Sequence, residues 1–247
     1  MSDTPLDRMP GYRRCLRVEA GDGAVVAQME DDYHCMSVTL EHDGERVSAI
    51  IPDMHRAPWT TCPGAPAILV ETFAGVPLNE ITARRDKQAN CTHLHDLAVL
   101  AAAHAHERGS FTYAIFASDP VEGERVLEIQ RDGVLLMHWV ERDGVLVSPD
   151  SVNGKTLLTL RDWIAALPEP DREAARLLQW GSIVAHGRTL PWDRLHRAEN
   201  MPANCYGFQP ERVASAVRVG TIIDFSGARA GPLDTYGANE ISRVRHG

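Results

Sequence analysis

Residues 12–53 read YRRCLRVEAGDGAVVAQMEDDYHCMSVTLEHDGERVSAIIPD, and this stretch decides the fold. Residues that favour strands alternate along it with two turn signals, GDG at 21–23 and HDGE at 42–45. Strands joined by such short glycine-containing turns pair antiparallel with their neighbours in the chain. The stretch therefore predicts a small antiparallel meander.

The same order of elements then occurs again. Helices are expected at about 62–74 and 90–107, and four strand-like segments follow, FTYAIFAS, ERVLEIQRDG, VLLMHWVERDG and VLVSPD. Two helix-like segments come next, KTLLTLRDWIAAL and EPDREAARLLQWGSIVAHG. This pattern predicts an α+β protein of antiparallel β-meanders packed with helices. The repetition suggests two similar strand-then-helix halves, 1–108 and 109–247, packed as one unit, with a C-terminal arm at 226–247.

Charge and composition restrict the possible partners. The chain has 247 residues, a formal net charge of -9 and no run of Lys or Arg. An acidic chain without basic patches is a poor ligand for nucleic acid or for anionic membranes. We therefore expect neither partner, and we expect a small-molecule substrate.

The N-terminal residues MSDTPLDRMPGY lack the basic start and apolar centre of a signal peptide, which predicts a cytoplasmic protein. Five cysteines without a CxxC spacing fit reduced thiols. GxGxxG, Walker, GxSxG and HExxH motifs do not occur. Accordingly, no cofactor is expected. The acidic surface and the glycine-rich C-terminal residues would suit a homodimer.

His34 is the first candidate catalytic residue. It stands in DDYHCMSVTL, at the start of an expected strand, where it would share a face with Asp32 and Met36 while Tyr33 points to the opposite face. A carboxylate beside an imidazole sets its tautomer, which is what a general base requires. Alternatively, His34 is an edge-strand histidine in water.

The stretch PDMHRAPWTTCPGAP is expected to form an irregular loop that carries function. Asp53 and His55 are candidate residues for orienting a catalytic base. Trp59 is either a core residue or an aromatic wall for a ring-shaped ligand. Cys62 follows close by.

Residues 90–97, NCTHLHDL, carry a cysteine and two histidines at the expected start of a helix. Asn90 is a good N-cap residue, which would place Cys91 at the first helical position. There the helix dipole would make its thiol unusually acidic, although a small buried residue is the alternative. His93 and His95 would point in roughly opposite directions, so at most one of them faces a given pocket.

One more candidate lies outside these motifs. Tyr206 in NCYGFQPER is expected on a loop that leads into a short helix, where its hydroxyl would serve as a general acid or would orient a phenol. Alternatively, it packs by its ring.

The YRR start, YHCMSVTLEHDG, APWTTCPGA and NCTHLHDL resemble DUF2889, a family of uncharacterised bacterial proteins. The resemblance covers about residues 12–105, with a looser match at CYGFQPER. The polar positions that match the family pattern are Tyr12, Arg13, His34, Cys62, Cys91, Thr92 and His93, and the family carries little assigned chemistry. The resemblance suggests a link to the breakdown of aromatic compounds, including lignin-derived dimers, by cofactor-free lyases that release formaldehyde.

The leading hypothesis is therefore a cofactor-independent lyase for a small phenolic substrate, with His34 or His93 as the base. Asp53 or His55 would orient that base, and Tyr206 would assist in catalysis. The expected substrate-binding residues are Trp59, Arg13, Tyr33 and Cys91. One alternative is a zinc-dependent hydrolase with His34, Cys62, Cys91 and His93 as ligands. Another is a binding protein without catalytic activity.

Overall fold

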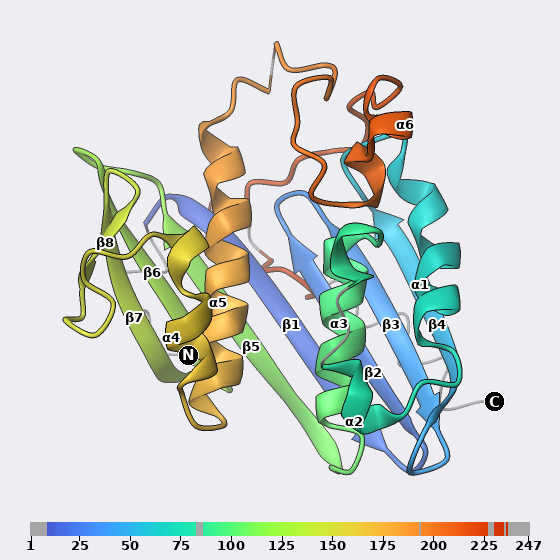
Figure 1. Ribbon diagram of the computed structural model, residues 1–247. Helices are drawn as coiled ribbons and strands as arrows, with labels where there is room; N and C mark the ends of the chain where they lie inside the picture. Colours follow the sequence, from blue (N-terminus) through green and yellow to red (C-terminus); the bar gives the residue numbers. More distant parts are fainter. Residues whose placement is uncertain (1–8, 83–85, 193, 227–229, 235, 237–247) are drawn as a thin grey trace. The chain divides into compact units, whose positions relative to one another are not determined.

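The computed structural model describes residues 9–82, 86–192, 194–226, 230–234 and 236. Eight strands form one antiparallel sheet in the order β4-β3-β2-β1-β5-β6-β7-β8 (Figure 1). The strands are β1 (Gly11–Gly21), β2 (Ala24–Asp31), β3 (Cys35–His42), β4 (Val47–Arg56), β5 (Gly109–Ser118), β6 (Glu124–Arg131), β7 (Val134–Arg142) and β8 (Val145–Ser148). The α+β prediction is confirmed.

The six α-helices of the described residues are α1 (Ala65–Phe73), α2 (Leu78–Ile81), α3 (Thr92–Ala103), α4 (Arg161–Ala165), α5 (Asp171–Ala185) and α6 (Pro210–Val213). Short 3-10 turns are also present, among them η2 (Cys62–Gly64), η3 (Asp86–Gln88) and η6 (Tyr206–Phe208). None of the described helices is long and apolar enough to cross a membrane.

The chain divides into two compact units, and each is described by itself. Unit 1 consists of Met1–Cys15, Thr112–Leu190 and Asp224–Gly247, and unit 2 of Leu16–Phe111 and Pro191–Ile223. Residues 191–223, which the expected division at 108/109 assigns to the second half, therefore belong to unit 2. The expected C-terminal arm lies mostly outside the described residues.

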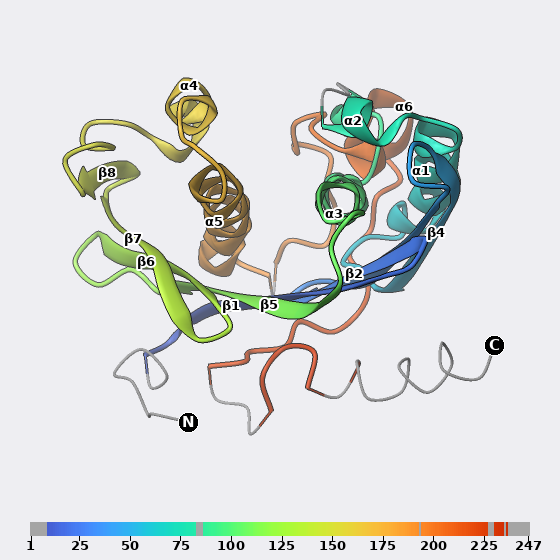
Figure 2. The same cartoon turned by 90° about the horizontal axis from the view of Figure 1, so that it is seen from below.

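In unit 2, helices α1 and α3 cover one face of strands β2, β3 and β4 (Figure 2). The core lies between these layers, because Val25, Ala27 and Met29 of β2 are fully buried and the expected apolar positions of α3 are buried as well. Those positions are Leu94, Leu97, Ala98 and Ala101. This packing fixes the start of α3 against the strands.

Helix α3 begins slightly differently from the expectation. Cys91 is the N-cap residue, with extended backbone angles, and Asn90 precedes it. The Asn90 amide instead donates a hydrogen bond of 3.0 Å to the hydroxyl of Thr72 in α1. The side chain of Asn90 therefore links α3 to α1, and the expected N-cap at Asn90 is wrong.

In unit 1, helix α5 packs on β6 and β7, with α4 beside it. The helix approaches the sheet closely at Gly181, where a Cβ atom would lie 2.8 Å from Cγ2 of Ile115 on β5. Arg14, which is 1% exposed, places its guanidinium carbon 4.3 Å from the ring centroid of Trp180 in α5. The first residues of β1 are thereby joined to α5 within this unit.

Candidate functional site

A tight turn between β2 and β3 holds the first two residues of the candidate site. Glu30 pairs with Cys35, and residues 32–34 connect Asp31, the last residue of β2, to the start of β3. Asp31 Oδ1 accepts the backbone N–H groups of Tyr33 at 2.8 Å and of His34 at 2.7 Å. Aspartate favours turns because its side chain accepts such nearby N–H groups. The local sequence therefore fixes this turn.

The same carboxylate also contacts the imidazole of His34. Asp31 Oδ1 lies 3.1 Å from His34 Nδ1, and both residues are buried, with Asp31 0% and His34 8% exposed. A carboxylate that accepts the Nδ1 proton leaves Nε2 with the lone pair, which is the form that can take up a proton. Asp31 and His34 are thus arranged as a carboxylate–imidazole dyad.

Arg56, the last residue of β4, supports the turn from the neighbouring strand. Its Nη2 donates to the backbone oxygen of Asp31 at 2.7 Å and to Glu30 Oε1 at 2.9 Å, and its Nη1 donates to the backbone oxygen of Asp32 at 2.9 Å. The rigid guanidinium fork suits several fixed acceptors at once. The sequence alone assigned no role to Arg56 or Asp31, although Arg56 lies in PDMHRAPWTTCPGAP and Asp31 in DDYHCMSVTL.

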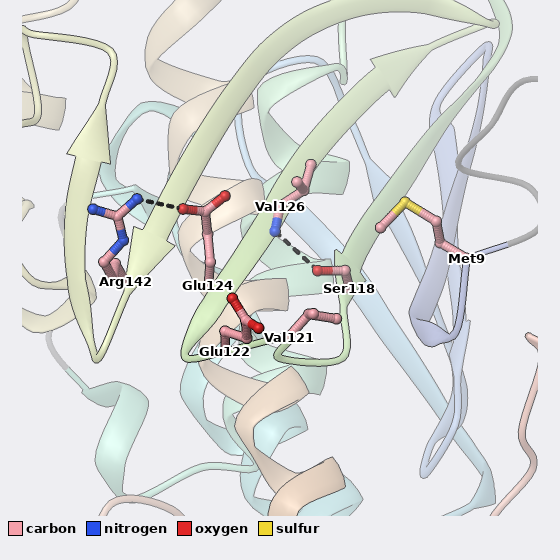
Figure 3. Close-up of a pocket in the computed structure, with 7 residues that line it drawn as sticks. All are labelled: Met9, Ser118, Val121, Glu122, Glu124, Val126 and Arg142. Atoms are coloured by element: carbon pink, nitrogen blue, oxygen red, sulfur yellow. Dashed lines mark hydrogen bonds and ion pairs between the residues drawn. The ribbon is translucent and has the colours of Figure 1, made fainter.

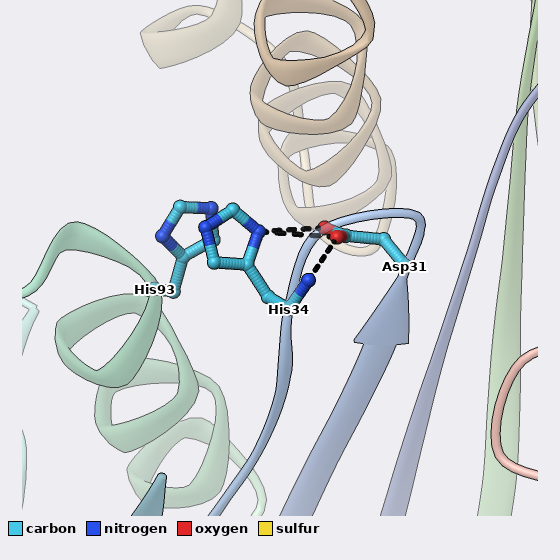
Figure 4. Close-up of side chains that lie close together, drawn as sticks. All are labelled: Asp31, His34 and His93. Atoms are coloured by element: carbon cyan, nitrogen blue, oxygen red, sulfur yellow. Dashed lines mark hydrogen bonds and ion pairs between the residues drawn. The ribbon is translucent and has the colours of Figure 1, made fainter. Parts of the chain in front are cut away.

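His93 completes the candidate site from the other layer of unit 2. It is the second residue of α3, and its ring stacks on that of His34 with centroids 3.8 Å apart and planes 28° apart (Figure 4). The turn before β3 and the start of α3 thus bring two imidazole rings into direct contact.

Three expected partners of His34 are not where the sequence suggested. Asp32 was expected to share a strand face with His34, but both residues lie in the loop before β3, and Asp31 makes the contact. Asp53 and His55 were expected in an irregular loop, but β4 extends through them to Arg56 and leaves both exposed. The residue that orients His34 is therefore Asp31.

The aromatic candidates separate into a core residue and a neighbour of His34. Trp59 is 5% exposed and packs against Phe208 and Trp192, with ring centroids 5.6 Å and 6.2 Å away. It belongs to the hydrophobic core of unit 2. Tyr33 is also buried, and its ring centroid lies 6.1 Å from that of His34 and 5.6 Å from that of Trp192.

Tyr206 connects residues 191–223 to the rest of unit 2. It begins η6, and its backbone N–H donates to the oxygen of Asn90 at 2.9 Å. Its ring lies beneath the Arg212 guanidinium, 3.9 Å from the centroid, and its hydroxyl end packs against Gly64. A side chain at position 64 would collide with that hydroxyl, so this glycine makes room for the tyrosine.

The thiols of unit 2 are buried or half-buried and carry their protons tightly. Burial raises the pKa of Cys62 to about 12 and that of Cys91 to about 11, although N–H groups at the start of α3 act to lower the Cys91 value. The expected acidic thiol at Cys91 is therefore wrong, because desolvation outweighs the helix terminus. Among the described residues, the cluster with metal-ligand spacing contains Asp31, His34 and His93, without Cys62 or Cys91.

Arg13 belongs to unit 1, where its guanidinium donates to the backbone oxygens of Met9 and Gly11 and lies 5.0 Å from the ring centroid of Phe116. Unit 1 also contains a cavity of about 470 Å³ (Figure 3). It is lined by Met9, Ser118, Val121, Glu122, Glu124, Val126 and Arg142. None of the expected site residues is among them.

No protein-family model matches the chain, and no curated protein matches it.

Proposed function

We propose that this chain is a cofactor-independent lyase that acts on a small phenolic substrate and releases a hydroxymethyl group as formaldehyde. The observation that supports it is the hydrogen-bonded contact of 3.1 Å between Asp31 and His34, with the His93 ring stacked on His34. This arrangement suits paired proton transfer, which is the chemistry that such a reaction needs.

The reaction is redox-neutral and needs no further reactant. A phenol with a leaving group at the benzylic carbon loses that group and its phenolic proton, which gives a quinone methide. A base then removes the proton of the neighbouring hydroxymethyl group. The carbon–oxygen bond becomes the carbonyl of formaldehyde, the carbon–carbon bond breaks, and its electron pair enters the quinone methide. The ring returns to a phenol when it takes up a proton.

The proposed roles follow the geometry of the three side chains. Asp31 holds Nδ1–H of His34, whose Nε2 removes the hydroxyl proton, and His93 returns a proton to the phenolate. Each transfer contributes roughly 10²- to 10⁴-fold to the rate. Tyr33 packs beside His34 and is the candidate contact for the substrate ring.

The substrate class comes from the resemblance of residues 12–105 to DUF2889 and its link to lignin-derived aromatics. The proposal includes a cytoplasmic homodimer, and the five cysteines, which are all free thiols, fit the reducing cytoplasm. No membrane or nucleic-acid partner forms part of it.

The experiment measures formaldehyde release from phenolic dimers that carry a hydroxymethyl side chain, with the full chain after dialysis against a chelator. We expect turnover by the wild type and a loss of about 10²-fold or more in kcat/KM for His34→Gln. His138→Ala is the matched control, because His138 Nδ1 also contacts a carboxylate, that of Glu128 at 2.7 Å, within unit 1.

Equal activity of His34→Gln and His138→Ala would show that the proposed centre is wrong. The absence of formaldehyde from every phenolic dimer would remove the lyase assignment.

A further inference from the structure

We infer that Asp31, His34 and His93 bind one divalent transition-metal ion, and that this ion inhibits the proton transfer proposed above. The inferred binding rests on side-chain geometry alone, whereas the inhibition rests on the proposed function. Each of the three residues offers one ligand atom, and these atoms all lie within 4.8 Å of one another (Figure 4).

The ligand set indicates the class of ion. Two imidazoles and one carboxylate suit Zn²⁺, Fe²⁺ and Co²⁺, whereas Mg²⁺ and Ca²⁺ prefer oxygen ligands. A tetrahedral ion with Zn–N and Zn–O bonds near 2.0 Å holds its ligand atoms about 3.3 Å apart. Asp31 Oδ1 and His34 Nδ1 already lie 3.1 Å apart. An ion can therefore take the place of the shared proton with little movement of these two groups.

The turn holds two of the ligands in place before the ion arrives. Asp31 is fixed because it accepts the N–H groups of Tyr33 and His34, and Arg56 holds the backbone oxygen of Asp31. A preorganised pair reduces the entropy lost on binding. The first two ligands therefore need no folding step to come together.

His93 supplies the third ligand by a rotation of its ring. The stacked planes differ by only 28°, so the lone pairs of the two rings lie in nearly parallel planes and do not yet converge on one point. His93 is only partly buried and stands in the first turn of α3, where its side chain can turn toward the dyad.

Inhibition follows from the two nitrogens of His34. If the ion binds Nδ1, the neutral ring carries its proton on Nε2 and has no lone pair there. If the ion binds Nε2, that lone pair is used directly. In either case His34 cannot accept the hydroxyl proton of a substrate, so metal binding and proton transfer exclude each other.

The binding experiment uses the full chain after chelator treatment, with Co²⁺ and Zn²⁺ as probes. We expect one equivalent of Co²⁺ to produce visible absorption bands of a coordinated ion, and Zn²⁺ to displace it. Asp31→Asn, His34→Gln and His93→Gln should each weaken binding about tenfold or more, whereas His138→Ala should bind as the wild type does. Asp31→Asn keeps an oxygen acceptor for the turn, and circular dichroism of each variant checks that it is folded.

The site is overturned if the wild type binds neither ion, or if folded His34→Gln and His93→Gln bind as tightly as the wild type. Inhibition is tested separately through formaldehyde release. One equivalent of Zn²⁺ should abolish release, and a chelator should restore it. If formaldehyde release requires the ion, both the inhibition and the cofactor-independent lyase are refuted, and the metal site itself stands. Release that is unaffected by a bound ion would refute the inhibition alone.

Discussion

Arg56 Nη2 lies 2.7 Å from the backbone oxygen of Asp31 and 2.9 Å from Oε1 of Glu30. A single side chain at the end of β4 thereby joins the last residues of β2 to the turn that carries His34. The guanidinium and the Glu30 carboxylate are both largely buried, with side-chain exposures of 13% and 9%. The position of the candidate dyad thus depends on a residue of the edge strand.

Replacement of Arg56 should be costly for this reason. Arg56→Ala removes a buried ion pair and several hydrogen bonds to backbone oxygens, and we expect it to lower the free energy of unfolding by about 3 kcal/mol. Arg56→Lys keeps the charge but not the fork, so its loss should be smaller. Urea denaturation measures both. If Arg56→Ala is as stable as the wild type, the guanidinium does not hold the turn.

The buried thiol of Cys91 should make the fold sensitive to alkali. Burial raises its pKa from the ordinary 9.0 to about 11. Because the folded value is the higher one, the stabilisation is complete below pH 9.0 and is lost as pH rises toward about 11. A shift of this size corresponds to about 3 kcal/mol.

Cys91→Ala removes this loss. Between about pH 8 and about pH 11, the free energy of unfolding of the wild type should therefore fall relative to that of the variant, as urea denaturation measures. Cys62 acts in the same direction. Its pKa is raised first by burial, which both chains share, and then by Cys91, so its own contribution to the loss is smaller in the variant and adds to the effect. A difference that stays constant with pH would contradict the raised pKa of Cys91.

The close contact of α5 with the sheet in unit 1 predicts a harmful Gly181→Ala substitution. The new Cβ would lie 2.8 Å from Cγ2 of Ile115, and overpacking of this kind costs about 1–3 kcal/mol. Helix propensity alone would favour alanine by about 1 kcal/mol.

Gly181→Ala should therefore cost less in an Ile115→Ala background than in the wild type, with a coupling energy of about 1 kcal/mol in a double-mutant cycle. Thermal or urea denaturation of the four chains measures it. A stabilising Gly181→Ala would mean that the helix and sheet are not in close contact.

The meander could be predicted from the sequence because its signals are local. GDG and HDG each give a glycine with positive φ at a hairpin turn, Gly23 and Gly44, and alternate apolar residues mark the buried face. The helical spacing of Leu94, Leu97 and Ala98 was equally local. These features depend on neighbours in the chain, so a single sequence contains them.

The candidate site depends on contacts between residues that lie far apart in the sequence or in an irregular turn. Whether His93 meets His34 is decided by how α3 docks on β2 and β3, which no local pattern encodes. Asp31, and not Asp32, contacts His34 because its side chain binds backbone N–H groups in the turn. The alternation of side chains along a strand cannot predict a contact of this kind. Trp59 gave no local sign of being a core residue, since its partners Trp192 and Phe208 lie far along the chain.

Asp31 restrains both the peptide and the ring of His34, and this has an evolutionary consequence. A lineage that exchanges the carboxylate alone would distort the hairpin as well as lose the ring contact, whereas exchange of the histidine leaves both backbone contacts in place. The aspartate should therefore persist in diverged sequences even where the histidine has been replaced.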